Sequence, residues 1–292
     1  MKKNKSELWN DKAEIRFFSN ALENFASVEQ LFYRLYDGYY AYIPKGYTSE
    51  NQTLQSRNSL IGQYTEKWCR DLLNPIAKKM NLYAVNGVVC EALGLSRQSN
   101  ADLAFCTTKE TNQKPENIKL LFEIKMSIVS NYKYTESNKI QHISDFTKHK
   151  GIPSLLRSDS MLKAIGKSVN IRVSGIEACK IPIIVLGNSP ITENYIKKVD
   201  FLRQSGVIQA FWSLNPKPSN NNFLECSPNK GFDTIFDSDQ LFSYCYELIK
   251  SENIYFSSML TKNRLGEIIK IASREKEIVK CADKFLSLIQ GK

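Results

Sequence analysis

Two carboxylates and a lysine in the middle of the chain have the types and spacing of a metal-dependent hydrolytic site. Glu123 and Lys125 stand two residues apart in the apolar run 118–126, and Asp102 enters a second apolar run, 101–107. Residues two apart in a strand point to the same face, so Glu123 and Lys125 should project together. If the two runs pair as a hairpin, Asp102 and Glu123 converge, and adjacent carboxylates need a cation, usually a divalent metal. The alternative is a structural Glu–Lys pair, with Asp102 capping a turn.

The composition narrows the chemistry further. Forty Lys and Arg against thirty Asp and Glu give a formal net charge of +10. Because phosphate contacts need basic side chains, this surplus favours a polyanionic partner, above all nucleic acid, although a lysine-rich surface also serves solubility alone. The two histidines, His142 and His149, lie in no ligand pattern, and no two of the seven cysteines have Cys-x-x-Cys spacing. Zinc sites, redox dithiols and Ser-His-Asp catalysis are therefore disfavoured, and we expect both histidines in loops or at the surface.

The hydrophobic pattern gives no indication of a membrane protein. The longest purely aliphatic stretch, IPIIVL at 181–186, is far shorter than the roughly 20 residues that a membrane span needs. The N-terminal MKKNKSELWN is basic but is followed by no apolar run, so no signal peptide is predicted. We expect a cytoplasmic protein with no membrane partner.

The elements that must position these side chains alternate between helical and strand patterns. The patterns predict helix over the first forty residues, with an apolar face over 27–42, and further helices over 59–80, 155–173 and 192–205. They predict strands over 83–92, 101–107, 118–126, 181–187 and 207–214, and polar connections over 44–58 and 127–153. This order predicts an α/β fold with a mixed central β-sheet flanked by helices and with helical N- and C-terminal additions. Its expected parts are an N-terminal helical and loop segment (1–58), a core (59–214) and a C-terminal helical extension (215–292), unless the chain forms one continuous domain.

The order of these motifs resembles that of a known family. Asp102 followed by Glu123-x-Lys125, after a long helix and before further α/β elements, is similar to the PD-(D/E)xK nuclease superfamily and, within it, to the type II restriction endonucleases. The resemblance covers 59–214 and departs from the family pattern at Ala101, where the family's nominal Pro would stand. It implies a restriction endonuclease-like core around these residues.

The same resemblance implies roles for the site residues. Asp102 and Glu123 would be Mg²⁺ ligands together with the backbone carbonyl of Ile124. Lys125 would orient and help to activate the attacking water and stabilise the transition state. Many relatives place a helical acid near the metal, which makes Glu66 on the helix 59–80 a further candidate, with a solvated surface residue as the alternative.

The helix 155–173 carries the basic residues that we expect to contact DNA. Lys163 and Lys167 are spaced i,i+4, and Arg157 and Arg172 stand at its ends. This predicts a cationic ridge along the DNA backbone, or else a solvated helix face. The packed side is expected to comprise Met161, Leu162, Ile165 and Val169, extending to Ile171. The polar segment 127–153 adds side chains suited to bases and phosphates, although most surface loops do so too.

These observations predict a Mg²⁺-dependent type II restriction endonuclease that makes sequence-specific double-strand breaks in DNA. Cutting a palindromic duplex needs two sites related by a two-fold axis, so a homodimer is expected. A repair or junction nuclease on the same core is the enzymatic alternative, and a non-catalytic DNA-binding protein is the other.

Overall fold

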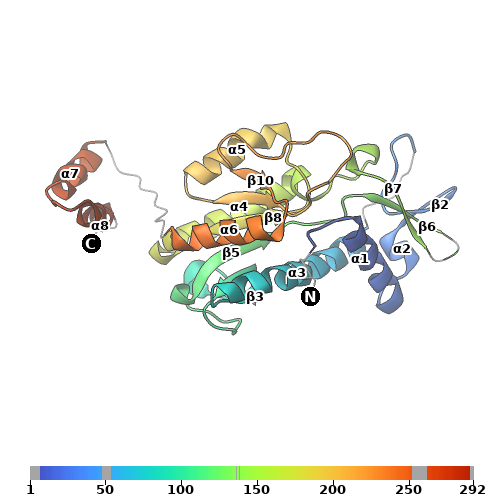
Figure 1. The fold of residues 1–292 in the computed structure, drawn as a ribbon, viewed down its shortest axis with the longest axis horizontal. Helices are drawn as coiled ribbons and strands as arrows, with labels where there is room; N and C mark the ends of the chain where they lie inside the picture. The colour runs from blue at the N-terminus through green and yellow to red at the C-terminus, as the bar shows by residue number, and fades with distance from the viewer. Residues whose placement is uncertain (1–6, 48–53, 136, 138, 252–261, 290–292) are drawn as a thin grey trace. The chain divides into compact units, whose positions relative to one another are not determined.

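The structure is a computed structural model that describes residues 7–47, 54–135, 137, 139–251 and 262–289 (Figure 1). Its contacts divide the chain into two compact units, Met1–Asn253 and Ile254–Lys292. The second unit contains two helices, α7 (Lys262–Ala272) and α8 (Ile278–Ile289). Within the described ranges, no helix is both long and apolar enough to cross a membrane.

The centre of the first unit is a six-stranded mixed sheet in the order β10-β9-β8-β5-β4-β3. Its strands are β3 (Tyr83–Val88), β4 (Ala101–Cys106), β5 (Ile118–Ile124), β8 (Ile183–Gly187), β9 (Ala210–Ser213) and β10 (Phe232–Thr234). The strands β3, β4 and β5 run antiparallel, whereas β5, β8, β9 and β10 run parallel. Parallel neighbours need long crossover connections: the crossover from β5 to β8 contains α4 (Ser158–Val173), that from β8 to β9 contains α5 (Glu193–Gln204), and a long loop joins β9 to β10. The predicted α/β class with a mixed sheet is confirmed.

Helices cover both faces of this sheet (Figure 1). Buried residues of α1 (Asp11–Asn24), α3 (Gln55–Lys79) and α6 (Ser238–Lys250) share one hydrophobic core with one face of the sheet. Buried residues of α4 (Ser158–Val173) and α5 (Glu193–Gln204) pack on the opposite face. The short 3₁₀ helices are Glu91–Leu93, Pro115–Asn117, Phe146–Lys148, Ser154–Leu156 and Ile176–Lys180.

A second, four-stranded antiparallel sheet replaces the helix predicted over 27–42. Only a short helix, α2 (Val28–Leu31), forms there, and β1 (Tyr33–Leu35) and β2 (Gly38–Tyr40) follow it as a hairpin. Tyr36 and Asp37 make the turn, and Gly38, the first residue of β2, adopts a φ of 141° that side chains rarely tolerate. The strands β6 (Asn131–Tyr134) and β7 (Ile140–Ser144) complete this sheet, in the order β1-β2-β6-β7. They come from the segment predicted to be a polar connection.

The compact units have other boundaries than the predicted segments. Trp9, Phe17 and Phe18 are fully buried in the main core, so the N-terminal segment is an integral part of the first unit. The strand β10 pairs with β9, and α6 packs in the same core. Residues 215–253 therefore belong to the main unit, because their apolar side chains are needed to cover the sheet.

Candidate active site

Strand pairing brings Asp102 and Glu123 together. In the antiparallel register of β4 and β5, Leu103 faces Phe122 and Ala104 faces Leu121. Extending this register by one residue places Asp102 opposite Glu123, where side chains on the same face are close neighbours. The backbone N–H of Ile124 donates a 2.6 Å hydrogen bond to Asp102 Oδ2, which holds this carboxylate against the end of β5.

The alternation along β5 decides what covers the site. Phe122 and Ile124 pack in the core shared with α3, as expected from the period of two. Leu121, on the other face, packs in a cluster with Ile171 of α4. Glu123 lies on that second face, so helix α4 is the element that lies over the carboxylates.

Four charged side chains form a compact cluster at this place, which we call the carboxylate–lysine cluster: Asp102, Glu123, Lys125 and Lys167. Lys125 Nζ lies 2.5 Å from Glu123 Oε1 and 3.7 Å from Asp102 Oδ2. Lys167 Nζ lies 2.6 Å from Glu123 Oε2 and 3.0 Å from Asp102 Oδ1. The side chains keep only 9–19% of their exposure, so each charge relies on the others for compensation.

The environment shifts the protonation of this cluster. Burial raises the pKa of Glu123, and the adjacent Asp102 carboxylate raises it further, despite the opposing effect of both lysines. Burial works to lower the pKa of Lys167, but the carboxylates of Asp102 and Glu123 outweigh it, so the net shift is upward. Lys167 is therefore held as an ammonium ion by two acids.

Glu66 lies within electrostatic range of the cluster but makes no direct ion pair with it in the described structure. Burial raises the pKa of Glu66, and the charge of Asp102 is the next cause. Asn86 Nδ2 donates to the backbone carbonyls of both Glu66 and Asp102, at 3.2 and 2.9 Å, and so ties α3 to β4 at this level. The predicted helical acid is therefore beside the site, in an outer position.

The sequence predicts Lys167 on a cationic ridge that faces DNA or solvent, whereas the structure places its ammonium beside Asp102 and Glu123. The packed face of α4 differs in part from the predicted one: Met161 and Ile171 are buried as expected, whereas Leu162 is 62% and Val169 40% exposed. The buried positions of α4 are Met161, Ala164, Ser168 and Ile171. Lys167 follows Ala164 by three positions and precedes Ile171 by four, which puts it on the sheet-facing side. This spacing around small residues was the available signal.

The other basic residues of α4 do not line up as one ridge. Arg172 points inward and donates to the carbonyls of Val207 and Ile181 at 3.1 and 2.8 Å. Arg157 forms a two-pronged pair with Asp159, and the more exposed Lys163 lies 3.9 Å from the same acid. The expected ridge of four cations therefore reduces to Arg157 and Lys163 as side chains facing solvent.

Backbone hydrogen bonds hold the end of β5 that carries Lys125. Its N–H donates to the Leu186 carbonyl at 2.7 Å, and Ser154 Oγ donates to its carbonyl at 2.5 Å. Ser154 Oγ also accepts from the backbone N–H of Asn188, whose side chain bonds Ser127. Lys125 is therefore presented from a rigid strand end.

A buried acid orders the segment that follows Lys125. Glu14 of α1 is 1% exposed and accepts hydrogen bonds from the Trp9 indole at 2.8 Å and from the backbone N–H groups of Val129 and Ser130 at 2.7 and 3.0 Å. Burial raises its pKa to about 7 against these donors, which act to lower it. His149, predicted in a loop or at the surface, lies in the connection after the 3₁₀ helix Phe146–Lys148 but is buried there, where it stacks on Tyr42 and bonds the Val129 carbonyl.

The cluster offers a magnesium ion oxygen ligands of the right type, but few of them. Carboxylate oxygens of Asp102 and Glu123 and the Ile124 carbonyl are oxygen ligands of the type that Mg²⁺ takes, and Mg²⁺ commonly keeps several waters. Over the described part of the chain, no group of three or more Asp, Glu, His or Cys side chains could hold a metal. Two carboxylates and one carbonyl are thus the full protein donor set at this site.

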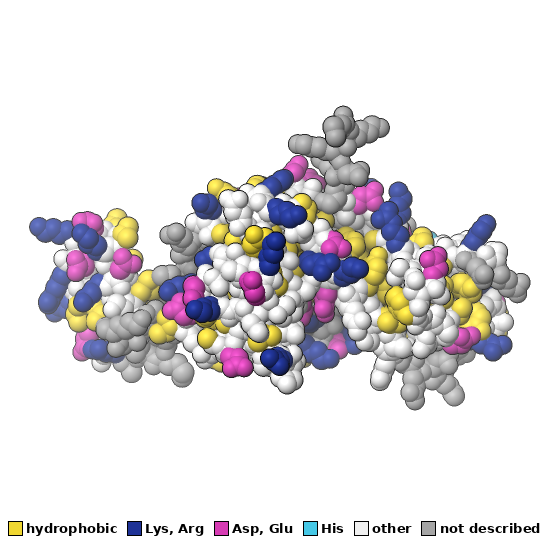
Figure 2. Space-filling model, turned by 90° about the horizontal axis from the view of Figure 1, so that it is seen from below, with side chains coloured by type: hydrophobic (Ala, Val, Ile, Leu, Met, Phe, Trp, Pro, Cys, Tyr) yellow, Lys and Arg dark blue, Asp and Glu magenta, His cyan; other side chains and the backbone are white. Residues whose placement is uncertain are grey.

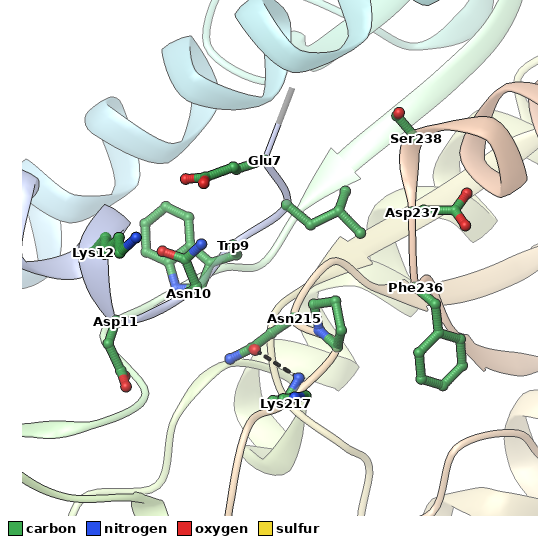
Figure 3. Close-up of a pocket in the computed structure, with 12 residues that line it drawn as sticks. Glu7, Trp9, Asn10, Asp11, Lys12, Asn215, Lys217, Phe236, Asp237 and Ser238 are labelled. Atoms are coloured by element: carbon green, nitrogen blue, oxygen red, sulfur yellow. Dashed lines mark hydrogen bonds between the residues drawn. The ribbon is translucent and has the colours of Figure 1, made fainter. Parts of the chain in front are cut away.

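A separate cavity of about 550 Å³ lies between the start of α1 and the loops after β9 and β10 (Figure 3). Asn10 caps α1 and Asp237 caps α6 at its rim. Its described lining includes Trp9, Asn215 and Phe236, and none of these lining residues belongs to the carboxylate–lysine cluster. The charged cluster and this cavity are therefore at different places.

Comparisons of the chain with protein-family models, with curated proteins and with solved structures find no match. The surface charge is also mixed: on the face drawn in Figure 2, acidic side chains are interspersed among the basic ones. The chemistry of the carboxylate–lysine cluster is therefore the basis on which a function can be argued.

Proposed function

We propose that this protein is a Mg²⁺-dependent endonuclease of restriction type, which hydrolyses phosphodiester bonds in double-stranded DNA. The observation that carries the proposal is the meeting of Asp102 and Glu123 on one face of two paired strands, with the Lys125 ammonium 2.5 Å from Glu123. Two nearly buried acids beside a lysine on a rigid strand end are the groups that metal-assisted phosphodiester hydrolysis requires.

Each residue then has a distinct task. Asp102 and Glu123 would hold Mg²⁺, which when bound polarises the scissile phosphate and acidifies a water molecule. Lys125 positions the attacking water by hydrogen bonding and offsets the negative charge that grows on the phosphate oxygens. The water oxygen attacks phosphorus in line, the bond to the 3′ oxygen breaks, and the products carry a 5′-phosphate and a 3′-hydroxyl.

The four-stranded sheet is the part of the fold best suited to hold the duplex near this site. Its strands β6 and β7 lie in the chain between Lys125 and α4, the two parts of the chain that supply the lysines of the cluster. Lys139, Lys148 and Lys150 are exposed on this excursion. Asn131 and Tyr132 also lie in the segment 127–153 predicted to contact bases and phosphates. They are fully buried, so they are not among the side chains that could contact bases.

The proposal is tested by incubating plasmid DNA with the full chain in Mg²⁺ and, as a control, in EDTA. D102A should lose cleavage while retaining its circular dichroism spectrum, because it removes a ligand and no core volume. The matched control D71A changes an exposed acid of α3, whose side chain is 61% exposed, and should cut normally.

Discrete fragments from the wild-type protein would support a restriction enzyme, whereas a smear would favour a repair or other non-specific nuclease. Absence of cleavage on DNA of varied sequence and structure would refute the proposal in favour of a DNA-binding protein. A homodimer is expected, and sedimentation of the chain at micromolar concentration measures it directly.

A further inference from the structure

We propose that Lys167 is a built-in counter-cation of the active site, which competes with the divalent metal for the carboxylates and, once displaced, binds the phosphate backbone of the substrate. This inference rests on the proposed function, since it concerns the same two acids. It assigns a regulatory and substrate-positioning role to a residue that lies outside the motif on β4 and β5.

The two lysines divide the carboxylate oxygens between them. Lys125 contacts Glu123 Oε1 and approaches Asp102 Oδ2, whereas Lys167 contacts the other oxygen of each acid, Oε2 and Oδ1. All four oxygens therefore face an ammonium group. A Mg²⁺ ion binds oxygen at about 2.0–2.1 Å, so a metal that takes Glu123 Oε2 and Asp102 Oδ1 competes for space and charge with the Lys167 ammonium, which lies 2.6 and 3.0 Å from these oxygens.

Lys167 is the lysine that can leave. Lys125 is held beside Glu123 by its own strand and additionally donates to the carbonyl of Ile124 at 3.2 Å. Lys167 instead reaches the acids from helix α4, on a flexible four-carbon side chain. Its ammonium group is paired with the two carboxylates, and the described part of the chain shows no further ion pair for it, so a cation that takes those oxygens removes what holds it in place.

The charge balance gives the displaced lysine a destination. Two carboxylates and two ammonium groups sum to zero, and adding a divalent ion makes the cluster doubly positive. The site then attracts an anion, and the phosphodiester is the anion that the reaction supplies. Metal and DNA should therefore bind cooperatively, because the metal displaces the Lys167 ammonium from the carboxylates and the phosphate of the DNA pairs with it in its displaced position.

The test measures metal binding by titration calorimetry with Mn²⁺ or Ca²⁺ on the full chain without DNA. We expect K167M to bind the metal at least tenfold more tightly than the wild type, because the competing charge is gone. K163M is the matched control: Lys163 lies one helical turn earlier on α4, is 75% exposed and should leave the metal affinity unchanged. K167Q is measured in parallel and should show the same direction of change.

A second measurement separates competition from a structural role. In Ca²⁺, K167M should lose at least tenfold in affinity for duplex DNA although it binds the metal more tightly, and the coupling between the two ligands should fall. Unchanged or weaker metal affinity in both K167M and K167Q would overturn the inference, as would unaltered DNA affinity. If the wild-type protein binds metal through Asp102 but never cleaves DNA, the proposed function fails while the competition result still stands.

Discussion

The buried acid Glu14 offers a quantitative test of how this structure is held together. Its carboxylate joins α1 to the backbone of Val129 and Ser130, a few residues after β5, and its pKa is raised from 4.5 to about 7. A difference of about 2.5 pKa units between the unfolded and folded states corresponds to about 3 kcal/mol. The variant E14Q removes the titration and keeps a similar shape.

The sign of the effect follows from proton binding. Between pH 4.5 and 7 the folded protein holds a proton on Glu14 that the unfolded chain has lost, so stability falls as the pH rises. The full contribution is present below about pH 4.5 and is lost once the pH passes the folded value near 7. The free energy of unfolding of the wild type, relative to that of E14Q, should therefore decrease by about 3 kcal/mol from pH 4.5 to 8.

Urea unfolding followed by tryptophan fluorescence measures this difference. The three tryptophans, Trp9, Trp68 and Trp212, all belong to the unit that contains Glu14, so the signal reports its unfolding. Altered hydrogen bonds in E14Q add a pH-independent amount to the difference between the two proteins, so the test is whether that difference changes with pH. Parallel stability curves over the whole range would refute the assigned burial of a titrating carboxyl group.

Three further outcomes are expected. K125A should raise the activation barrier for cleavage by about 3–4 kcal/mol, whereas its DNA affinity in Ca²⁺ should stay within about tenfold of the wild type. If cleavage rate and DNA affinity fall equally across a range of Mg²⁺ concentrations, Lys125 is an ordinary phosphate contact. Burial is the main cause that raises the pKa of Glu123, so the affinity of the wild type for Mn²⁺ should fall as the pH is lowered from neutral. The variant E123Q should bind Mn²⁺ weakly at every pH and show no such decline; a pH-independent affinity of the wild type would contradict this. DNA binding in Ca²⁺ should weaken steeply between 50 and 200 mM salt, as measured by fluorescence anisotropy, whereas a flat response would remove the polyanion inference from the charge of +10.

Local patterns in the sequence determine the elements that carry the motif. The alternation along 118–126 sends Glu123 and Lys125 to one face and Phe122 and Ile124 to the other, and the structure has them so. Helix α3 and strand β8 likewise appear where their apolar periodicity predicts them. These features depend on side-chain direction within a single element, which the covalent chain imposes with a period of 3.6 or 2.

Partners that come from distant parts of the chain required the tertiary structure. The segment 27–42 has helical spacing, but pairing of β2 with β6, more than 90 residues later, makes it a hairpin. Lys167 belongs to the site because the sheet selects which side of α4 is packed, a choice that its ambiguous apolar pattern leaves open. Likewise, Glu14 is buried only because the backbone of 129–130 supplies its hydrogen bonds. The side-chain directions of the motif on β4 and β5 thus follow from local sequence. The positions of Lys167 and Glu14 depend instead on packing between segments far apart in the chain, which no short stretch of sequence determines.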